Sequence, residues 1–177
     1  MSSIRDAAKR IIKKAHDAKI KFDQQHDADR IAADAEADRM AEVVRTQDRL
    51  VDIVAPLFSG AVNEFHMANH EASALRRPIN NTTKEPLILD DGDKRFTVLS
   101  ELAFRHPDSP ETAPIFATVR FVGGPIGVPS GEQVIRIYGG RNEDESLESY
   151  DEYKISSIPE ASVIEQRITE LLEDLCE

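Results

Sequence analysis

The sequence has no tryptophan and only one cysteine among its 177 residues. That cysteine, Cys176, cannot close a disulfide within the chain, which is typical of a protein in a reducing compartment. No stretch contains the roughly 18 to 20 consecutive apolar residues that a membrane span needs, and residues 1–22 lack the apolar centre of a secretory signal. We therefore expect a cytoplasmic protein with no membrane span.

Glycine and proline are absent from the first 55 residues, which are rich in Ala and in charged residues. This composition favours a helix with little to interrupt it. A polar patch at Gln25, His26 and Asp29 leaves open a hairpin that turns near residues 23–27. The absence of glycine there favours one continuous helix instead.

Pro56 and Gly60 are the first helix-breaking residues in the chain. Proline removes one backbone donor, so we expect a kink or a break at this point. A second helical piece is predicted to follow and to end near Leu75. The sequence thus divides into a helical arm over residues 1–76 and a second region over residues 77–177.

Apolar residues recur along one side of the predicted helix, at the spacing of about 100° per residue. This stripe consists of Ile4, Ala8, Ile11, Ala15, Ala18 and Phe22, and later of Ala33, Ala37, Met40, Val44, Val51, Val54, Phe58, Val62 and Phe65. Leaving it in water would forfeit more free energy than the stability margin of a small domain. We expect its part from Ala33 to Phe65 to be buried against a helix of a second copy, as in a coiled coil, because folding back onto the sheet would compete with the C-terminal helix for the same face. The partner-binding candidates in this part are Met40, Val44, Val51 and Phe58.

Charge is unevenly distributed along the chain. The formal net charge is −11, yet residues 1–21 carry seven Lys or Arg against two Asp and have a net charge of +5. The candidates for binding an acidic partner are Lys9, Arg10, Lys13 and Lys14. An alternative function is therefore a regulator that binds nucleic acid through the basic helix over residues 4–21, although the remaining net charge of −16 opposes it.

The pattern changes to alternating apolar and polar residues after a polar connector over residues 78–86. Strands are predicted over residues 87–90, 94–104, 115–122 and 133–138, with a shorter one over 153–156, and Asp91-Gly92 predicts a tight hairpin turn. We expect Phe96, Val98, Leu102 and Phe104 to share one face. Consecutive strands without intervening helices predict an antiparallel meander of four or five strands.

The last element is an amphipathic helix. The sequence Ser157-Ile158-Pro159-Glu160 resembles a capping box and places the start of this helix at Ser157. Apolar residues then follow at helical spacing up to Leu175. A helix packed on the sheet completes the predicted fold class, which is α+β.

Residues 123–131 form the most glycine-rich part of the chain. A phosphate-binding loop opens a helix, whereas here a strand follows, so we expect a long hairpin loop. Ile126 and Val128 are predicted to lie near its tip. Exposed apolar residues on a rigid sheet are a partner-binding feature, so both are candidates.

Signs of catalysis are few. His66 and His70 lie one helical turn apart and suggest a second alternative, a small metal-dependent enzyme, but the sequence offers no third ligand. No nucleophile motif is present, and Cys176 falls in the last turn of a helix, where the helix dipole disfavours a thiolate. We therefore expect no cofactor and a protein that is not an enzyme.

The sequence predicts a non-catalytic interaction, assembly or adaptor protein that self-associates through its N-terminal helices. It identifies neither the partner nor the number of copies in the oligomer.

Overall fold

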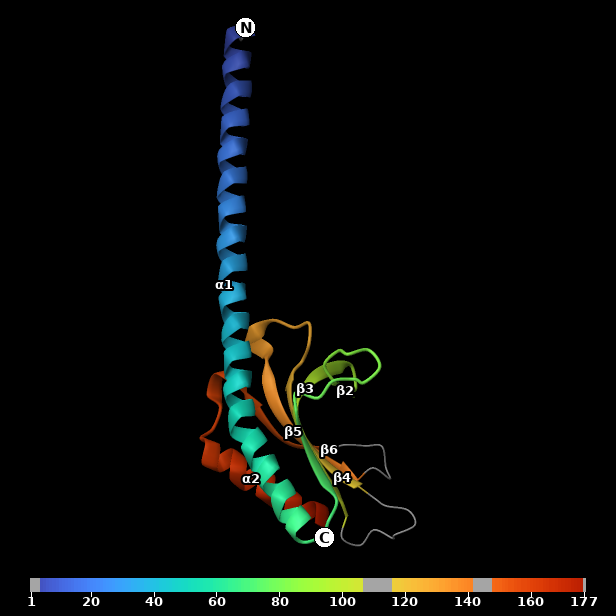
Figure 1. The fold of residues 1–177 in the computed structure, drawn as a ribbon. Coiled ribbons are helices and arrows are strands. Elements are labelled where there is room, and N and C mark those ends of the chain that lie inside the picture. Colours follow the sequence, from blue (N-terminus) through green and yellow to red (C-terminus); the bar gives the residue numbers. More distant parts are fainter. Residues whose placement is uncertain (1–3, 107–115, 142–147, 177) are drawn as a thin grey trace. The chain divides into compact units, whose positions relative to one another are not determined.

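The computed structural model describes residues 4–106, 116–141 and 148–176 and confirms the α+β fold class (Figure 1). It forms two compact units, Met1–Ala41 and Glu42–Glu177. The helices are α1 (Ile4–Met67) and α2 (Ala161–Cys176). The strands are β1 (Ala72–Arg76), β2 (Ile88–Asp91), β3 (Lys94–Arg105), β4 (Phe116–Gly124), β5 (Val134–Arg141) and β6 (Glu148–Lys154).

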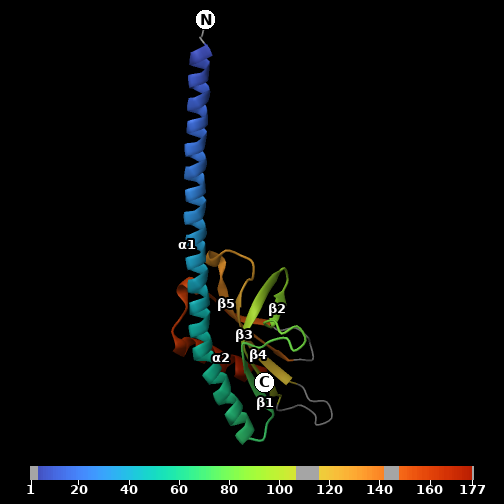
Figure 2. The ribbon, with the colours of Figure 1, turned by 45° about the horizontal axis from the view of Figure 1, so that its top comes forward.

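Helix α1 has no hairpin turn near residues 23–27, and Pro56 lies inside it. The expected break at Pro56 is therefore wrong, although the ribbon of α1 changes direction within residues 42–67 (Figure 2). A helix tolerates an internal proline at the loss of one hydrogen bond when packing holds the flanking turns in place. Here Val54 and Phe58 on either side are fully buried.

The helix ends at Met67, eight residues before Leu75. Asn69 adopts a left-handed conformation with φ of 64°, and the His70 amide donates to the Phe65 carbonyl at 2.8 Å. The Asn69 amide donates to the His66 carbonyl at 3.0 Å, which completes a Schellman motif. The chain then turns back as β1, so Leu75 lies in a strand that the periodicity did not predict.

The six strands form one antiparallel sheet in the order β1-β3-β4-β5-β6, and β2 pairs with the N-terminal half of β3. The main core lies on one face of this sheet. Residues 50–58 of α1 and the apolar side of α2 both pack there, against residues such as Phe104, Phe121 and Ile137. Figures 1 and 2 show the two helices on the same side, so they share a face for which the sequence suggested that they would compete.

A β-bulge in β3 divides its apolar residues between the two faces. The register with β4 shifts between Val98 and Ser100, which leaves Leu99 as the extra residue. Phe96 and Val98 therefore lie in a smaller cluster on the second face, with Val122 and Tyr138, while Leu102 and Phe104 lie in the main core. The expectation that all four β3 residues share one face is wrong because one inserted residue reverses the alternation.

Two local predictions need correction. The β2–β3 turn is centred on Gly92-Asp93 rather than Asp91-Gly92, and only Gly92 has positive φ, at 62°, as in a type II′ turn. Helix α2 begins at Ala161 rather than near Ser157, and the Glu160 carbonyl accepts from the Ile164 amide at 3.3 Å. A residue that precedes proline avoids the helical conformation, so Ile158 is extended and delays the helix.

Gly139 provides a test of the packing between α2 and the sheet. A Cβ added to Gly139 would stand 2.6 Å from Leu171 Cδ1 and 3.1 Å from its Cγ, so the whole buried side chain would have to move. We expect Gly139→Ala to lower the free energy of unfolding by about 1–3 kcal/mol, as measured by urea titration. Gly131→Ala is the control, because its Cβ would meet no atom within 4 Å; equal stability of the two variants would contradict this packing.

Candidate functional site

The first unit carries an uncovered apolar stripe. Its stripe residues from Ala8 to Met40 are all exposed, and Ile11 and Phe22 expose 68% and 69% of their surface. Two other large side chains, Ile20 and Ile31, are exposed on nearly the opposite side of the helix. Large apolar side chains aligned on one side of a helix are typical of a surface that packs against another element.

The same periodic pattern is buried further along the chain. Val51 and Phe58 are both buried in the core of their own unit, so neither side chain is available to a partner. The argument that this part of the stripe requires a second copy is therefore wrong, because the sheet covers it. Val44 remains 50% exposed, and Met40 is also exposed, so these two candidates retain an accessible surface.

The four basic candidates lie at different angles to the stripe. Lys9, Arg10, Lys13 and Lys14 are all exposed; at 3.6 residues per turn Lys9 and Lys13 point away from the stripe, whereas Lys14 borders it next to Ile11 and Arg10 lies to the side. An exposed cation on a helix interacts only weakly with any single partner charge. Their contribution to binding therefore depends on the summed charge of the segment.

The glycine-rich loop between β4 and β5 is held in place by one buried side chain. The Gln133 side-chain amide donates to the Pro125 carbonyl at 2.7 Å, and the Ile126 amide donates to the Arg95 carbonyl at 2.7 Å. Ile126 is 46% exposed, while Val128 is partly buried. These hydrogen bonds hold the loop in place. Of the two predicted residues, Ile126 is more exposed than Val128.

His66 lies in the last turn of α1, and His70 lies just after the helix ends. His66 Nε2 lies 3.0 Å from the Ala72 carbonyl, where its N–H donates to β1, and His70 is partly buried in the turn that follows. Among the described residues, no group of three His, Cys, Asp or Glu side chains is placed to hold a metal ion. Cys176 is also partly buried, and this burial raises the pKa of its thiol.

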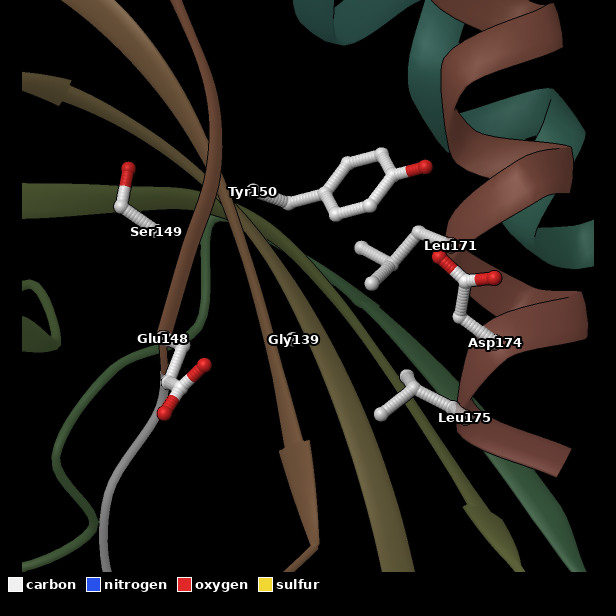
Figure 3. Close-up of a pocket in the computed structure, with 7 residues that line it drawn as sticks. All are labelled: Gly139, Glu148, Ser149, Tyr150, Leu171, Asp174 and Leu175. Carbon is white, nitrogen blue, oxygen red and sulfur yellow. The ribbon is translucent and has the colours of Figure 1, made fainter. Parts of the chain in front are cut away.

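A shallow cavity of about 240 Å³ lies between α2 and the edge of the sheet at β6 (Figure 3). Tyr150, Leu171 and Leu175 form its apolar part, and Glu148 and Asp174 add carboxylates. The described lining residues thus give the cavity an acidic rim. Sequence reasoning did not identify this cavity, because Tyr150 lies at a register shift that no periodicity predicts.

A charged network ties the β2 hairpin to the second face of the sheet. Arg136 donates to Asp91 Oδ2 at 2.6 Å and to Glu152 Oε2 at 2.5 Å, and its guanidinium lies 4.7 Å from the centre of the Phe96 ring. Tyr138 donates to the same Asp91 oxygen at 2.8 Å. These groups are mutually satisfied, so we assign the network to structure rather than to ligand binding.

Within the described residues, no helix combines the length and apolar character that crossing a bilayer requires. Comparison of the chain with protein-family models, curated proteins and solved structures gave no match.

The three tyrosines give a spectroscopic test of this geometry, because the chain has no tryptophan. Burial raises the pKa of Tyr138, Tyr150 and Tyr153, and Tyr153 also donates to Asp151 Oδ2 at 2.5 Å. Each phenol is neutral in the folded chain above the ordinary pKa of 10.0, at which the unfolded chain ionises. Their contribution to stability is therefore present below pH 10 and is lost as the pH rises through the folded pKa values.

We expect the tyrosinate absorbance of the folded protein to rise only above pH 10, together with loss of structure by circular dichroism. In denaturant the same absorbance should rise around the ordinary pKa. A folded protein in which one tyrosine titrates at its ordinary pKa would contradict the arrangement of that side chain.

Proposed function

We propose that this chain is a non-catalytic assembly or adaptor protein that self-associates through its N-terminal helix. The pairing surface consists of the exposed stripe residues Ala8, Ile11, Ala15, Ala18, Phe22, Ala33, Ala37, Met40 and Val44, which we call the helix stripe. The observation that carries this proposal is the exposure of Ile11 and Phe22 on the side of the helix where the apolar residues gather. A second copy offers the same apolar surface, which is the simplest way to cover both.

The expected gain is large enough to hold two copies together. Covering a side chain of the size of Ile or Phe is worth roughly 1.5–3 kcal/mol, and each copy contributes several such residues. Part of this gain is offset by the loss of translational and rotational freedom on association. The surplus is compatible with a complex that forms at micromolar concentration.

Nucleic-acid binding is the competing proposal, and the exposed cations of residues 9–14 support it. The charge of the rest of the chain opposes it, because residues after 21 sum to −16. Neutralising Lys9, Arg10, Lys13 and Lys14 together would abolish a salt-dependent association with DNA or RNA, if one exists. The same change would leave an apolar helix pair able to form.

Substitutions in the stripe provide the main test. We expect the wild-type chain to be a dimer or higher oligomer by light scattering at micromolar concentration. Ile11→Asp or Phe22→Asp places a desolvated charge in the seam and should weaken association roughly tenfold or more. Circular dichroism and thermal unfolding should show that the second unit remains folded.

Ile31→Asp is the matched control, because Ile31 is 64% exposed on the same helix but lies nearly opposite the stripe. It should leave the oligomer unchanged. A monomeric wild-type chain, or equal effects of Ile31→Asp and Ile11→Asp, would rule out the helix stripe as the pairing surface.

The β4–β5 loop is proposed as a second contact with a protein partner, through Ile126 and to a lesser extent Val128. Ile126→Ser should leave the melting temperature almost unchanged, because the side chain is half-exposed. It should reduce the binding of any partner captured by the wild-type chain, since an apolar anchor is worth about 1 kcal/mol or more. A large fall in melting temperature would show that Ile126 belongs to the core instead.

A further inference from the structure

The first unit consists of two segments of opposite charge. Residues 4–22 contain seven Lys or Arg and two Asp, for a net charge of +5. Residues 23–41 contain Asp23, Asp27, Asp29, Asp34, Glu36 and Asp38 against Arg30 and Arg39, for a net charge of −4. Both segments belong to α1, and the side chains from Ala8 onward are almost all exposed.

The orientation of a helix pair decides which of these segments meet. In a parallel pair each segment lies beside the same segment of the other copy, so the two basic segments meet and the two acidic segments meet. In an antiparallel pair the basic segment of each copy lies beside the acidic segment of the other. Charges that flank a helix seam select the orientation in this way, because like charges within a few ångströms repel even where solvent screens them.

We infer that the helix stripe is covered by a second copy of this chain in antiparallel orientation, with residues 4–22 of one copy against residues 23–41 of the other. This inference rests on the proposed self-association and specifies its geometry. The pair is isologous, so each contact occurs twice about a two-fold axis. Electrostatic attraction then adds to the burial of the stripe rather than opposing it.

The antiparallel arrangement also accounts for the interruption of the stripe. Gln25, His26 and Asp29 are exposed polar residues in an otherwise apolar side of the helix. When residues 4–22 lie on residues 23–41, this interruption comes opposite residues 16–20 of the other copy, within about one turn of Lys14 and Lys19. In a parallel pair the same three polar residues meet only themselves, and Asp29 faces Asp29.

The overlay also defines the apolar contacts of the pair. Ile11 of one copy comes opposite residue 34 of the other, next to Ala33, so a large side chain packs beside a small one. Ala8 comes opposite Ala37, and the Phe22 side chains of the two copies meet near the two-fold axis.

Disulfide cross-linking tests the orientation directly in the full chain, with Cys176→Ser as the background. Ala8→Cys and Ala37→Cys introduce thiols on the stripe side at positions that oppose each other in the antiparallel overlay. We expect the two single variants to form a cross-linked dimer only when they are refolded together and oxidised. Each variant alone should give no cross-linked dimer, because its thiols lie at opposite ends of the pair.

The outcomes separate the orientation from the self-association. Cross-linking of Ala8→Cys with itself, in a chain that remains dimeric by light scattering, would overturn the antiparallel orientation and leave the proposed function standing. A monomer with no cross-link in any combination would overturn both. Ala35→Cys lies away from the stripe and is the control, since it should not cross-link with Ala8→Cys.

Salt provides an independent readout with opposite signs for the two orientations. Raising the sodium chloride concentration screens the attraction in an antiparallel pair, so the dissociation constant should rise severalfold. In a parallel pair salt would screen repulsion, and the dissociation constant should fall. A fall would therefore contradict the inference.

Discussion

The structure depends on the covering of one face of the sheet by two helices at once. Val51, Val54 and Phe58 of α1 and Ile164 and Ile168 of α2 are buried against the same layer of strand residues, and the Phe65 ring stacks on Phe104 with centroids 4.7 Å apart. The ion pairs Arg76–Asp52 and Arg77–Asp48 connect β1 to α1. The apolar residues of α1 that lie in this core are thus covered within the second unit, whereas the stripe residues of the first unit are exposed.

The exposed and the buried parts of α1 have the same periodic pattern of apolar residues and differ only in their surroundings. Ile11 and Phe22 lie on the same side of the helix as Val51 and Phe58, yet the first pair is exposed and the second is buried in a core. A solvated stripe in a continuous helix is energetically unfavourable, and the proposed pairing with a second copy removes this cost by the same physical means that the sheet uses. Hydrophobic burial supplies the affinity in such a pair, while the opposite charges of residues 4–22 and 23–41 supply its direction.

Much of the fold follows from the sequence, and the exceptions have local causes. The long helix, four of the strands and α2 were predicted because their apolar periods extend over many residues. β1 was missed because it has only five residues and because the sequence of the Schellman turn at Asn69 looks like that of a continuing helix. The faces of β3 were misassigned because the extra residue at Leu99 leaves no compositional trace. For the candidate surface, the stripe was predicted correctly as a pattern, but periodicity cannot distinguish a residue that meets its own sheet, such as Val51, from one that remains exposed, such as Val44. That distinction requires the tertiary fold.

The edges of the sheet have a consequence for how copies of this chain can grow into larger assemblies. β6 forms one edge of the sheet, and β1 and β2, which pair with different halves of β3, form the other; an unprotected outer strand can accept further strands without limit. β1 and β2 are only five and four residues long, β1 ends at Arg76, which pairs with Asp52 of α1, and β6 carries Glu148, Asp151, Glu152 and Lys154. Strand addition at β6 would therefore bring carboxylates of two copies together. The sheet resists open-ended fibrous growth, and an association confined to a two-fold helix pair is complete as soon as two copies have met.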